Sequence, residues 1–314
     1  SEEVQLAAVT KTGSAIQYIL EQGIKPSEEV QLAAVTQNGH AIKFIIDKYT
    51  FEGGVRKLKE CLLEICKELN LRMLSGTKIL GKKIVFPITI TKEMLTDDIF
   101  EKRKIHKADT ISDKPKIGLV NGLWANDMGV GGLVPIEAFS IPTENKLQLE
   151  LTGQQGDVMK ESMRCAKTVA WNIIPNKYKE ILNKEWNEFG NTGIHIHCPD
   201  GATPKDGPSA GAAITTAIIS LLMNEPVDNK IAMTGEINLK GEVTEIGGLS
   251  QKLTGAKKAG ATHALIPLQN KSDVDKILAG ENNLIDENFK VTCVSNIWEV
   301  LNYCFNKKLD IKKL

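Results

Sequence analysis

Ser209 lies where a helix is predicted to begin, in the segment Asp206-Gly-Pro-Ser-Ala-Gly211 that leads into AAITTAIISLLM. Proline at a first helical position and an acid just before it are typical of helix starts. The first N–H groups of a helix have no partner within it, and with the helix dipole they stabilise an oxyanion. A serine here has the surroundings of a nucleophile that attacks a carbonyl group, although the pattern also describes an ordinary capping serine.

A nucleophilic serine needs a base, and histidine is one option. His195 and His197 share one face of the strand-like IHIHCP, so a Ser–His pair that uses His197 is one alternative. Together with Cys198 the two histidines also suggest zinc, but no further ligand cluster with metal spacing accompanies them, and we predict no metal site. Structural histidines are the simpler interpretation.

Lys252 is the other candidate base. At about 100° per residue, Leu249, Leu253, Ala256 and Ala259 form one apolar stripe of a predicted helix, and Lys252 falls inside this stripe. An apolar setting lowers the pKa of a lysine, as a general base requires. The alternative is a lysine whose amine extends to solvent.

These candidates stand in a region, 115–307, where helix and strand signals are mixed. Strand-like runs such as KLQLELTG and THALIPL alternate with helical runs at 158–174, 208–223 and 249–259, and glycine clusters separate them. The region has the usual size of a single domain. We therefore predict an α+β protein whose main part is a mixed α/β domain, followed by a short tail at 308–314.

A repeat opens the chain, because SEEVQLAAVT at 1–10 recurs unchanged at 27–36, a period of 26 residues. Each copy reads as a short helix, a glycine turn and a second helix, so we assign helical hairpin repeats to 1–44. Arrays usually need about three such units, and we expect a fragment, or further repeats before this one. Helical spacing continues over 45–75, and the charged stretch 76–114 is predicted to be a linker.

Composition limits the classes of function. Lys+Arg and Asp+Glu both number 39, and this balance argues against a protein built to hold nucleic acid or a membrane surface. No signal peptide pattern opens the chain, and the longest apolar run is too short to cross a bilayer. The six cysteines form no CxxC pair. We predict buried thiols in a reducing compartment and a cytoplasmic protein.

The longest motifs resemble the Lon protease family. GATPKDGPSAG at 201–211 is similar to the family's nucleophile motif, and MTGEINLKGEVTEIGGLSQKLTGAKKAG at 233–260 is similar to the motif that carries the catalytic lysine. The resemblance covers nearly all of 116–305. It implies a Lon-type proteolytic domain with Ser209 as the nucleophile and Lys252 as the general base and later acid.

The resemblance also implies supporting roles for other residues. Thr234, in MTGE, matches a threonine that supports the lysine, and Asp206 and His197 match positions near the serine. Upstream, IIDKYTFEGGVRKLKE at 45–60 is similar to the small helical lid of the family's ATPase module. Arg56 matches the arginine that senses nucleotide in that lid.

The chain departs from the family where the ATPase motifs normally stand, because the repeats occupy that place. Gly76-TKIL-Gly81-Lys82 has the spacing of a P-loop, but Lys83 follows instead of Ser or Thr, and no strand leads into it. The segment 284–287 is a poor Walker B match, and Asp127, in a glycine-rich loop, is left out of the catalytic set. We expect this chain alone to bind no cofactor. For the full-length enzyme the resemblance implies ATP and Mg, supplied by an ATPase module in cis or trans.

The resemblance implies an ATP-dependent serine endopeptidase that hydrolyses unfolded or misfolded proteins and assembles as a homo-oligomer, a ring of six protomers. The alternative is a non-catalytic module that binds proteins through the N-terminal repeats, against which the intact Ser209 and Lys252 argue. A third reading, a Ser–His hydrolase, predicts that His197→Ala is as damaging as Lys252→Ala.

Overall fold

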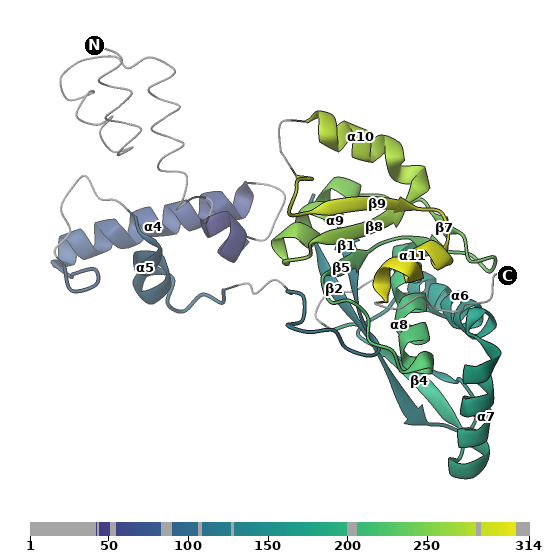
Figure 1. The fold of residues 1–314 in the computed structure, drawn as a ribbon. Helices are drawn as coiled ribbons and strands as arrows, with labels where there is room; N and C mark the ends of the chain where they lie inside the picture. The colour runs from purple at the N-terminus through teal and green to yellow at the C-terminus, as the bar shows by residue number, and fades with distance from the viewer. Residues whose placement is uncertain are drawn as a thin grey trace. The chain divides into compact units, whose positions relative to one another are not determined.

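The computed structural model describes residues 42, 44–50, 55–82, 90–105, 109–126, 129–199, 206–280 and 284–305. They belong to two compact units, one within residues 1–107 and one within residues 108–314, and each is described by itself (Figure 1). Apart from Ile42 and Phe44, the predicted repeats lie outside the described residues, and so do Asp127 and the tail at 308–314.

The first unit is helical in its described residues. The helices there are η1 (Ile46–Thr50), α4 (Arg56–Ser75), α5 (Lys92–Met94) and η2 (Leu95–Ile99). On α4, Cys61, Ile65 and Leu69 are buried because they recur every four residues and therefore share one face. Leu62 and Leu63, which have helical spacing in the sequence, are exposed instead.

The range predicted to be a linker is partly folded. Met94, Leu95 and Phe100 are buried in one cluster with the apolar face of α4. Arg103 forms an ion pair with Glu64 of α4. Much of the region between 90 and 105 is therefore part of the first unit's core, because its few apolar residues are the ones that cover α4.

The segment with P-loop spacing has a different structure. Gly76 is the left-handed C-cap of α4, with φ of 70°, and Thr77 N–H donates to Arg72 O at 2.9 Å. Leu80 and Gly81 then adopt positive φ in a tight turn that Ile79 and Lys82 close. The two glycines therefore serve a helix end and a turn.

The second unit is built on a seven-stranded sheet with the order β3-β4-β2-β1-β5-β8-β9. Pairs β1–β2 and β2–β4 are antiparallel, and the other four pairs are parallel. The strands are β1 (Leu119–Ala125), β2 (Gly131–Pro142), β3 (Leu149–Thr152), β4 (Thr192–His197), β5 (Ile231–Met233), β8 (His263–Pro267) and β9 (Lys290–Val294). A separate ribbon pairs β6 (Glu236–Ile237) with β7 (Val243–Thr244). The predicted mixed α/β fold is confirmed.

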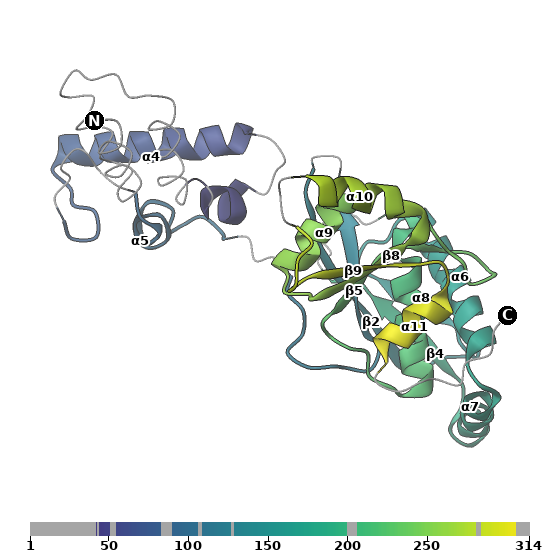
Figure 2. The ribbon, with the colours of Figure 1, turned by 45° about the horizontal axis from the view of Figure 1, so that its top comes forward.

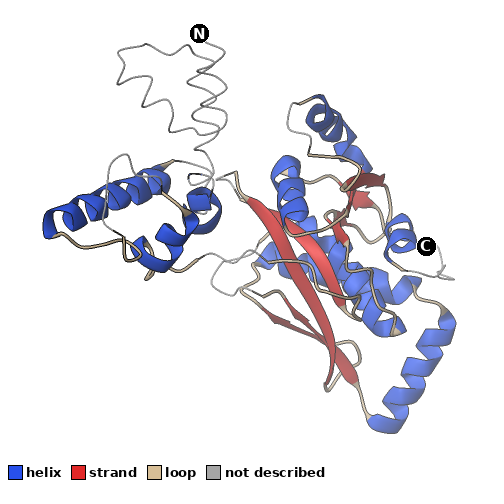
Figure 3. Cartoon of the chain, turned by 60° about the vertical axis from the view of Figure 1, so that its left-hand side comes forward, coloured by secondary structure: helices blue, strands red, loops and turns tan. Residues whose placement is uncertain are grey.

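Helices cover both faces of this sheet (Figures 1, 2 and 3). Alternation along the strands supplies the two faces, since Met233 and Leu265 belong to one apolar cluster and Ala232 and Ala264 to the other. The helices on the first face are α6 (Asp157–Ile173), α7 (Asn176–Phe189), α8 (Gly211–Met223) and α11 (Ile297–Cys304), and those on the second are α9 (Leu249–Lys258) and α10 (Lys271–Ala279).

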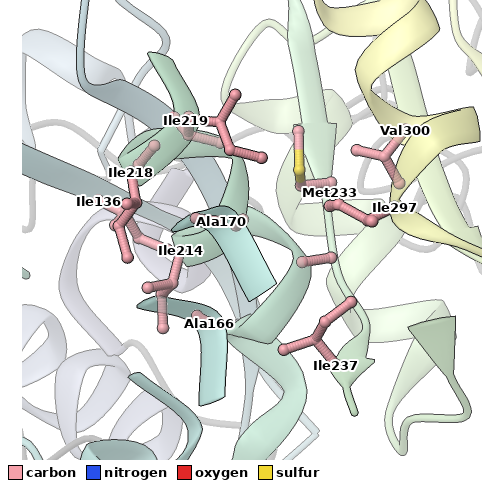
Figure 4. Packing of buried hydrophobic residues seen from close by; sticks show 14 of the residues in the cluster. Ile136, Ala166, Ala170, Ile214, Ile218, Ile219, Met233, Ile237, Ile297 and Val300 are labelled. Carbon is pink, nitrogen blue, oxygen red and sulfur yellow. The ribbon is translucent and has the colours of Figure 1, made fainter. Parts of the chain in front are cut away.

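Helix α8 is the centre of the larger core, and twelve of its thirteen residues are buried. Ile214, Ile218 and Ile219 pack among side chains of the sheet, α6 and α11 (Figure 4). The buried hydroxyls of Thr215 and Thr216 donate to the carbonyls one turn back, at 2.8 and 2.9 Å, so they are satisfied inside the helix. The helix predicted to begin at Ser209 is confirmed, and the structure shows that it is buried.

Two expectations need correction. No strand is expected from the sequence at 131–142, yet β2 runs through this range and is the neighbour of both β1 and β4. The cysteines are all free thiols, but only Cys61, Cys198 and Cys304 are buried, and Cys66 is exposed.

No helix among the described residues is long and apolar enough to cross a membrane.

We expect Ile218→Ala to lower the free energy of unfolding by about 2–5 kcal/mol, because it leaves a cavity in a fully packed region. Urea denaturation followed by circular dichroism measures this. Ile181→Ala on α7 is the matched control, since that side chain is 52% exposed. Equal effects of the two substitutions would contradict the central place of α8.

Candidate active site

Ser209 lies in a short 3₁₀ turn, η3 (Pro208–Ala210), that runs directly into α8. Gly207 has φ of 134° and ψ of 151°, a backbone conformation that residues other than glycine rarely adopt. Pro208 occupies the first helical position, as predicted. The sequence Gly-Pro-Ser therefore produces an abrupt helix start that leaves Ser209 partly exposed.

Asp206 holds this turn to α6. Its Oδ1 accepts hydrogen bonds from Met159 N–H at 3.1 Å and from Gly207 N–H at 3.0 Å. The N-cap of α6 is Gly156, which has no side chain, and a Cβ there would lie 2.4 Å from Asp206 Cγ. Asp206 therefore supplies, from a distant part of the sequence, the cap that α6 lacks.

The other side of the turn is fixed by the chain that follows β5. Ser209 O accepts from Gly235 N–H at 2.8 Å and from Thr234 Oγ1 at 3.1 Å. Ala212 N–H donates to Gly235 O at 3.0 Å, and Gly211 N–H donates to Pro208 O. Two of the N–H groups that the sequence suggests for an oxyanion are therefore already bonded.

Lys252 is buried in α9, where it is 4% exposed. Its neighbours on the buried face include Leu249, Leu253 and Ala256. Burial lowers the pKa of its amine to about 8, because the protonated form is poorly solvated there. No carboxylate of the described residues forms an ion pair with it. The alternative of an amine that extends to solvent is wrong.

Thr234 joins the two candidates. Lys252 Nζ donates to Thr234 Oγ1 at 3.3 Å, and the same hydroxyl donates to Ser209 O at 3.1 Å. Thr234 is itself buried; its contact with Lys252 is buried and its contact with Ser209 is partly buried. Ser209, Thr234 and Lys252 are thus brought together. In the described part of the chain the serine hydroxyl makes no direct hydrogen bond to the amine, and catalytic hydrogen bonds often form only when substrate is bound.

Glycines let α9 approach β2 at backbone distance. A Cβ on Gly131 would lie 2.2 Å from Gln251 O, and one on Gly255 would lie 2.5 Å from the Cα of Gly132. Side chains at these positions would push α9, and with it Lys252, away from the sheet. The sequence shows glycine clusters here, but it does not show that the clusters meet.

The hydrogen bond that His197 makes among the described residues is to Thr152, and its supporting role near the serine stays a prediction. The Nδ1 of His197 lies 2.7 Å from Thr152 Oγ1, and His195 Nε2 lies 2.9 Å from the same oxygen. The two histidines share one face of β4, as expected, and the hydroxyl of Thr152 on β3 is hydrogen-bonded to both. Among the described residues, no group of three or more His, Cys, Asp and Glu side chains could hold a metal ion.

Arg56 belongs to the first unit. It is the first residue of α4, is exposed, and its Nε lies 3.4 Å from Glu60 Oε1. Its nucleotide-sensing role stays a prediction. The segment with weak Walker B similarity forms a turn in which Asp286 pairs with Lys257 at 2.6 Å.

Comparison with known proteins identifies the class. Residues 89–307 match the Lon protease (S16) C-terminal proteolytic domain, and residues 28–83 match the Lon protease AAA+ ATPase lid domain. The lid match extends into the second predicted repeat. The proteolytic match begins before the boundary at 115 that we drew from the sequence.

Named relatives agree with this class. The Lon protease of Fervidobacterium nodosum is 39% identical over 262 residues, which are 83% of this chain and 29% of the relative. That of Haemophilus influenzae is 41% identical over 256 residues, 81% of this chain and 29% of the relative. A Lon protease homolog of Acanthamoeba polyphaga mimivirus is 40% identical over 234 residues, 71% of this chain and 22% of the relative.

The second unit is therefore the proteolytic domain of a peptidase. The chain belongs to the Lon protease family, and it spans less than a third of the length of these relatives.

The burial of Lys252 predicts a pH-dependent cost. The unfolded chain keeps this proton up to pH about 10.5 and the folded chain only up to about 8, so stability rises with pH between these values. Below pH 8 the cost is about 3 kcal/mol, from the size of the pKa shift. We expect Lys252→Met to be more stable than the parent at pH 7 by up to this amount, and the gain to vanish near pH 10.5.

Urea denaturation at several pH values measures the difference. Lys258→Met, at an exposed position of the same helix, should show no such gain. A Lys252→Met variant whose stability relative to the parent does not change between pH 7 and pH 10.5 would refute the lowered pKa.

The contact of Asp206 with α6 gives a second prediction. Asp206→Ala removes the cap of Met159 N–H and should cost about 1 kcal/mol of stability. Asp206→Asn keeps an oxygen that accepts this bond and should retain most of the stability. Thermal unfolding of the two variants tests this, and equal losses would show that the cap is not what matters.

Proposed function

We propose that this chain is the proteolytic part of an ATP-dependent Lon enzyme, a serine endopeptidase whose catalytic dyad is Ser209 and Lys252. The main support is the buried amine of Lys252, whose pKa of about 8 leaves it partly neutral near neutral pH. Thr234 connects that amine to the backbone of Ser209 through two hydrogen bonds.

The contacts of Thr234 suggest how the amine is oriented. Because the threonine hydroxyl gives its hydrogen to Ser209 O, its oxygen is left to accept from Lys252 Nζ. A neutral amine that donates one hydrogen to Thr234 keeps its lone pair free for another proton. That lone pair is the base that the serine hydroxyl needs.

The reaction then follows two acyl-transfer steps. Ser209 Oγ attacks the carbonyl carbon of the peptide bond while its proton moves to Lys252, and the resulting ammonium gives this proton to the leaving amine as the C–N bond breaks. Water next attacks the acyl-serine ester, again losing a proton to Lys252. The proton returns to Ser209 Oγ when the carboxylic acid product leaves, which restores the enzyme.

The helix start contributes electrostatically. The turn η3 and the buried helix α8 direct the positive end of their dipole toward the region of Ser209. Because Gly211 and Ala212 N–H groups already have acceptors, they are not the donors to an oxyanion in this arrangement. These N–H groups therefore contribute to stabilising an oxyanion only through the helix dipole.

The wider activity is proposed from the family. Substrates would be unfolded or misfolded proteins, delivered by an ATPase that binds ATP and Mg outside this chain, in cis or in trans. Assembly would be a homo-oligomeric ring of six protomers, with Arg56 in the lid responding to nucleotide. The six free thiols support action in a reducing compartment such as the cytoplasm.

We expect Ser209→Ala and Lys252→Met each to lower kcat for a fluorogenic peptide by at least about 1,000-fold, since the two groups act as a unit. In the parent, the rate should rise with pH through a midpoint near 8, as Lys252 loses its proton. Steady-state kinetics between pH 6 and pH 10 measure both effects.

His197→Ala distinguishes the Ser–His alternative. It should keep kcat within a few-fold of the parent, because its imidazole is bonded to Thr152. Undiminished cleavage by Ser209→Ala would reject the nucleophile, and a loss with His197→Ala as large as with Lys252→Met would favour histidine as the base.

A further inference from the structure

The side chain of Asn270 bonds to both backbone groups of Ile246. Asn270 is 4% exposed and ends η4 (Leu268–Asn270), the turn that directly follows β8. Its Oδ1 accepts from Ile246 N–H at 3.0 Å, and its Nδ2 donates to Ile246 O at 2.9 Å. The amide therefore takes the place of a neighbouring strand at this one residue.

Asp273 fixes the orientation of that amide. Asn270 Nδ2 donates its second hydrogen to Asp273 Oδ2 at 3.0 Å. A carboxylate only accepts hydrogen bonds, so it selects the end of the amide that carries the hydrogens. The Asn270 bond, with help from Lys276, lowers the pKa of Asp273 below its ordinary value, so the carboxylate stays charged. No other residue type of this size makes all three bonds.

Ile246, whose N–H and C=O are both bonded to Asn270, stands three residues before α9 begins. Gly247 and Gly248 follow it, and Gly248 adopts φ of 68° as the N-cap of the helix. Gly248 O accepts from Lys252 N–H at 3.0 Å, so Lys252 lies one turn beyond the glycine pair. Only Gly247 lies between Ile246 and this N-cap, and one residue spans at most about 3.6 Å. The starting point of α9 therefore depends on how firmly Ile246 is held.

Strand β8, which Asn270 follows in the chain, also positions Thr234. Thr234 N–H donates to Leu265 O of β8 at 3.1 Å, and Asn270 stands just past the end of β8. Gln269 adds a neighbouring bond, since its Oε1 accepts from Glu245 N–H at 2.7 Å. Thr234, which accepts the hydrogen bond from Lys252, and the segment that leads into α9 are thus both held by β8 and the turn that follows it.

We propose that Asn270 is a positioning residue for Lys252: by clamping Ile246 it sets the start of α9 so that the amine stays buried and meets Thr234. Its effect on turnover rests on the proposed dyad, whereas its effect on the environment of the amine does not. Asn270 itself touches no reacting atom.

The test compares Asn270→Leu with a matched variant, Asn121→Leu. Leucine has nearly the shape of asparagine but makes no hydrogen bonds. Asn121 is likewise buried, and its Nδ2 donates to Asn229 O and Ile231 O, both at 2.9 Å. These bonds lie at the beginning of β5, whereas Thr234 follows its end. Both variants should have a lowered Tm, so a general loss of stability is controlled.

The decisive measurement is the pKa of Lys252, followed by NMR of lysine labelled with ¹³C at Cε and assigned with Lys252→Met. In Asn270→Leu we expect this pKa to rise by about one unit from its value near 8, because water reaches the amine. We also expect kcat for a fluorogenic peptide to fall about tenfold at pH 7.5, with KM changed less than twofold, following the smaller neutral fraction of the base. Asn121→Leu should change neither quantity.

An unchanged Lys252 pKa in Asn270→Leu, or an equal rise in Asn121→Leu, would overturn the proposal. If Asn270→Leu does not fold, Asp273→Ala takes its place, since it removes the acceptor that orients the amide; a Lys252 pKa equal to that of the parent would then overturn it. An active Lys252→Met variant would reject the dyad but leave the pKa comparison valid, so the two failures are distinguishable.

Discussion

The site depends on burying a lysine amine whose hydrogen-bond partner, among the residues that the structure describes, is a hydroxyl and not a carboxylate. Taking a charge out of water is costly, and Lys252 avoids the full cost because burial lowers its pKa to about 8. A nearby carboxylate would favour the charged form and raise this pKa. Thr234 satisfies the amine without supplying charge. The apolar stripe of α9 and a buried threonine are therefore two requirements of the same chemistry.

Such an amine is useful only if its surroundings cannot relax around it, and several contacts restrict them. Helix α8 is buried on nearly all sides, and the turn before it is held by Asp206 from one side and by Thr234 and Gly235 from the other. At Gly131 and Gly255 the backbones of β2 and α9 meet so closely that no side chain fits. These contacts keep the serine and lysine segments at fixed places without joining them directly.

The parts that local pattern predicts are those whose cause is local. The apolar run after Ser209 and the stripe around Lys252 identify α8 and α9, because periodic burial follows from helix geometry. Strand β2 escapes prediction since glycines begin it and its burial does not alternate cleanly. Asp206 caps a helix that begins 49 residues earlier, and Asn270 binds Ile246 across 24 residues. The neighbouring sequence does not predict such contacts, because they arise from the topology of the sheet.

That topology explains why distant segments supply one site. Strands β1, β5 and β8 are adjacent and parallel, so their carboxyl ends reach the same edge of the sheet, where sites of α/β proteins form. Ala125 ends β1 against Gly248, where a Cβ would lie 2.8 Å from its own, while Thr234 follows β5 and Asn270 follows the end of β8. Each of these residues meets either Lys252 or the chain that leads into its helix. The position of the amine therefore depends on three neighbouring strands: Thr234 acts on it directly, and Ala125 and Asn270 act through the segment that leads into α9.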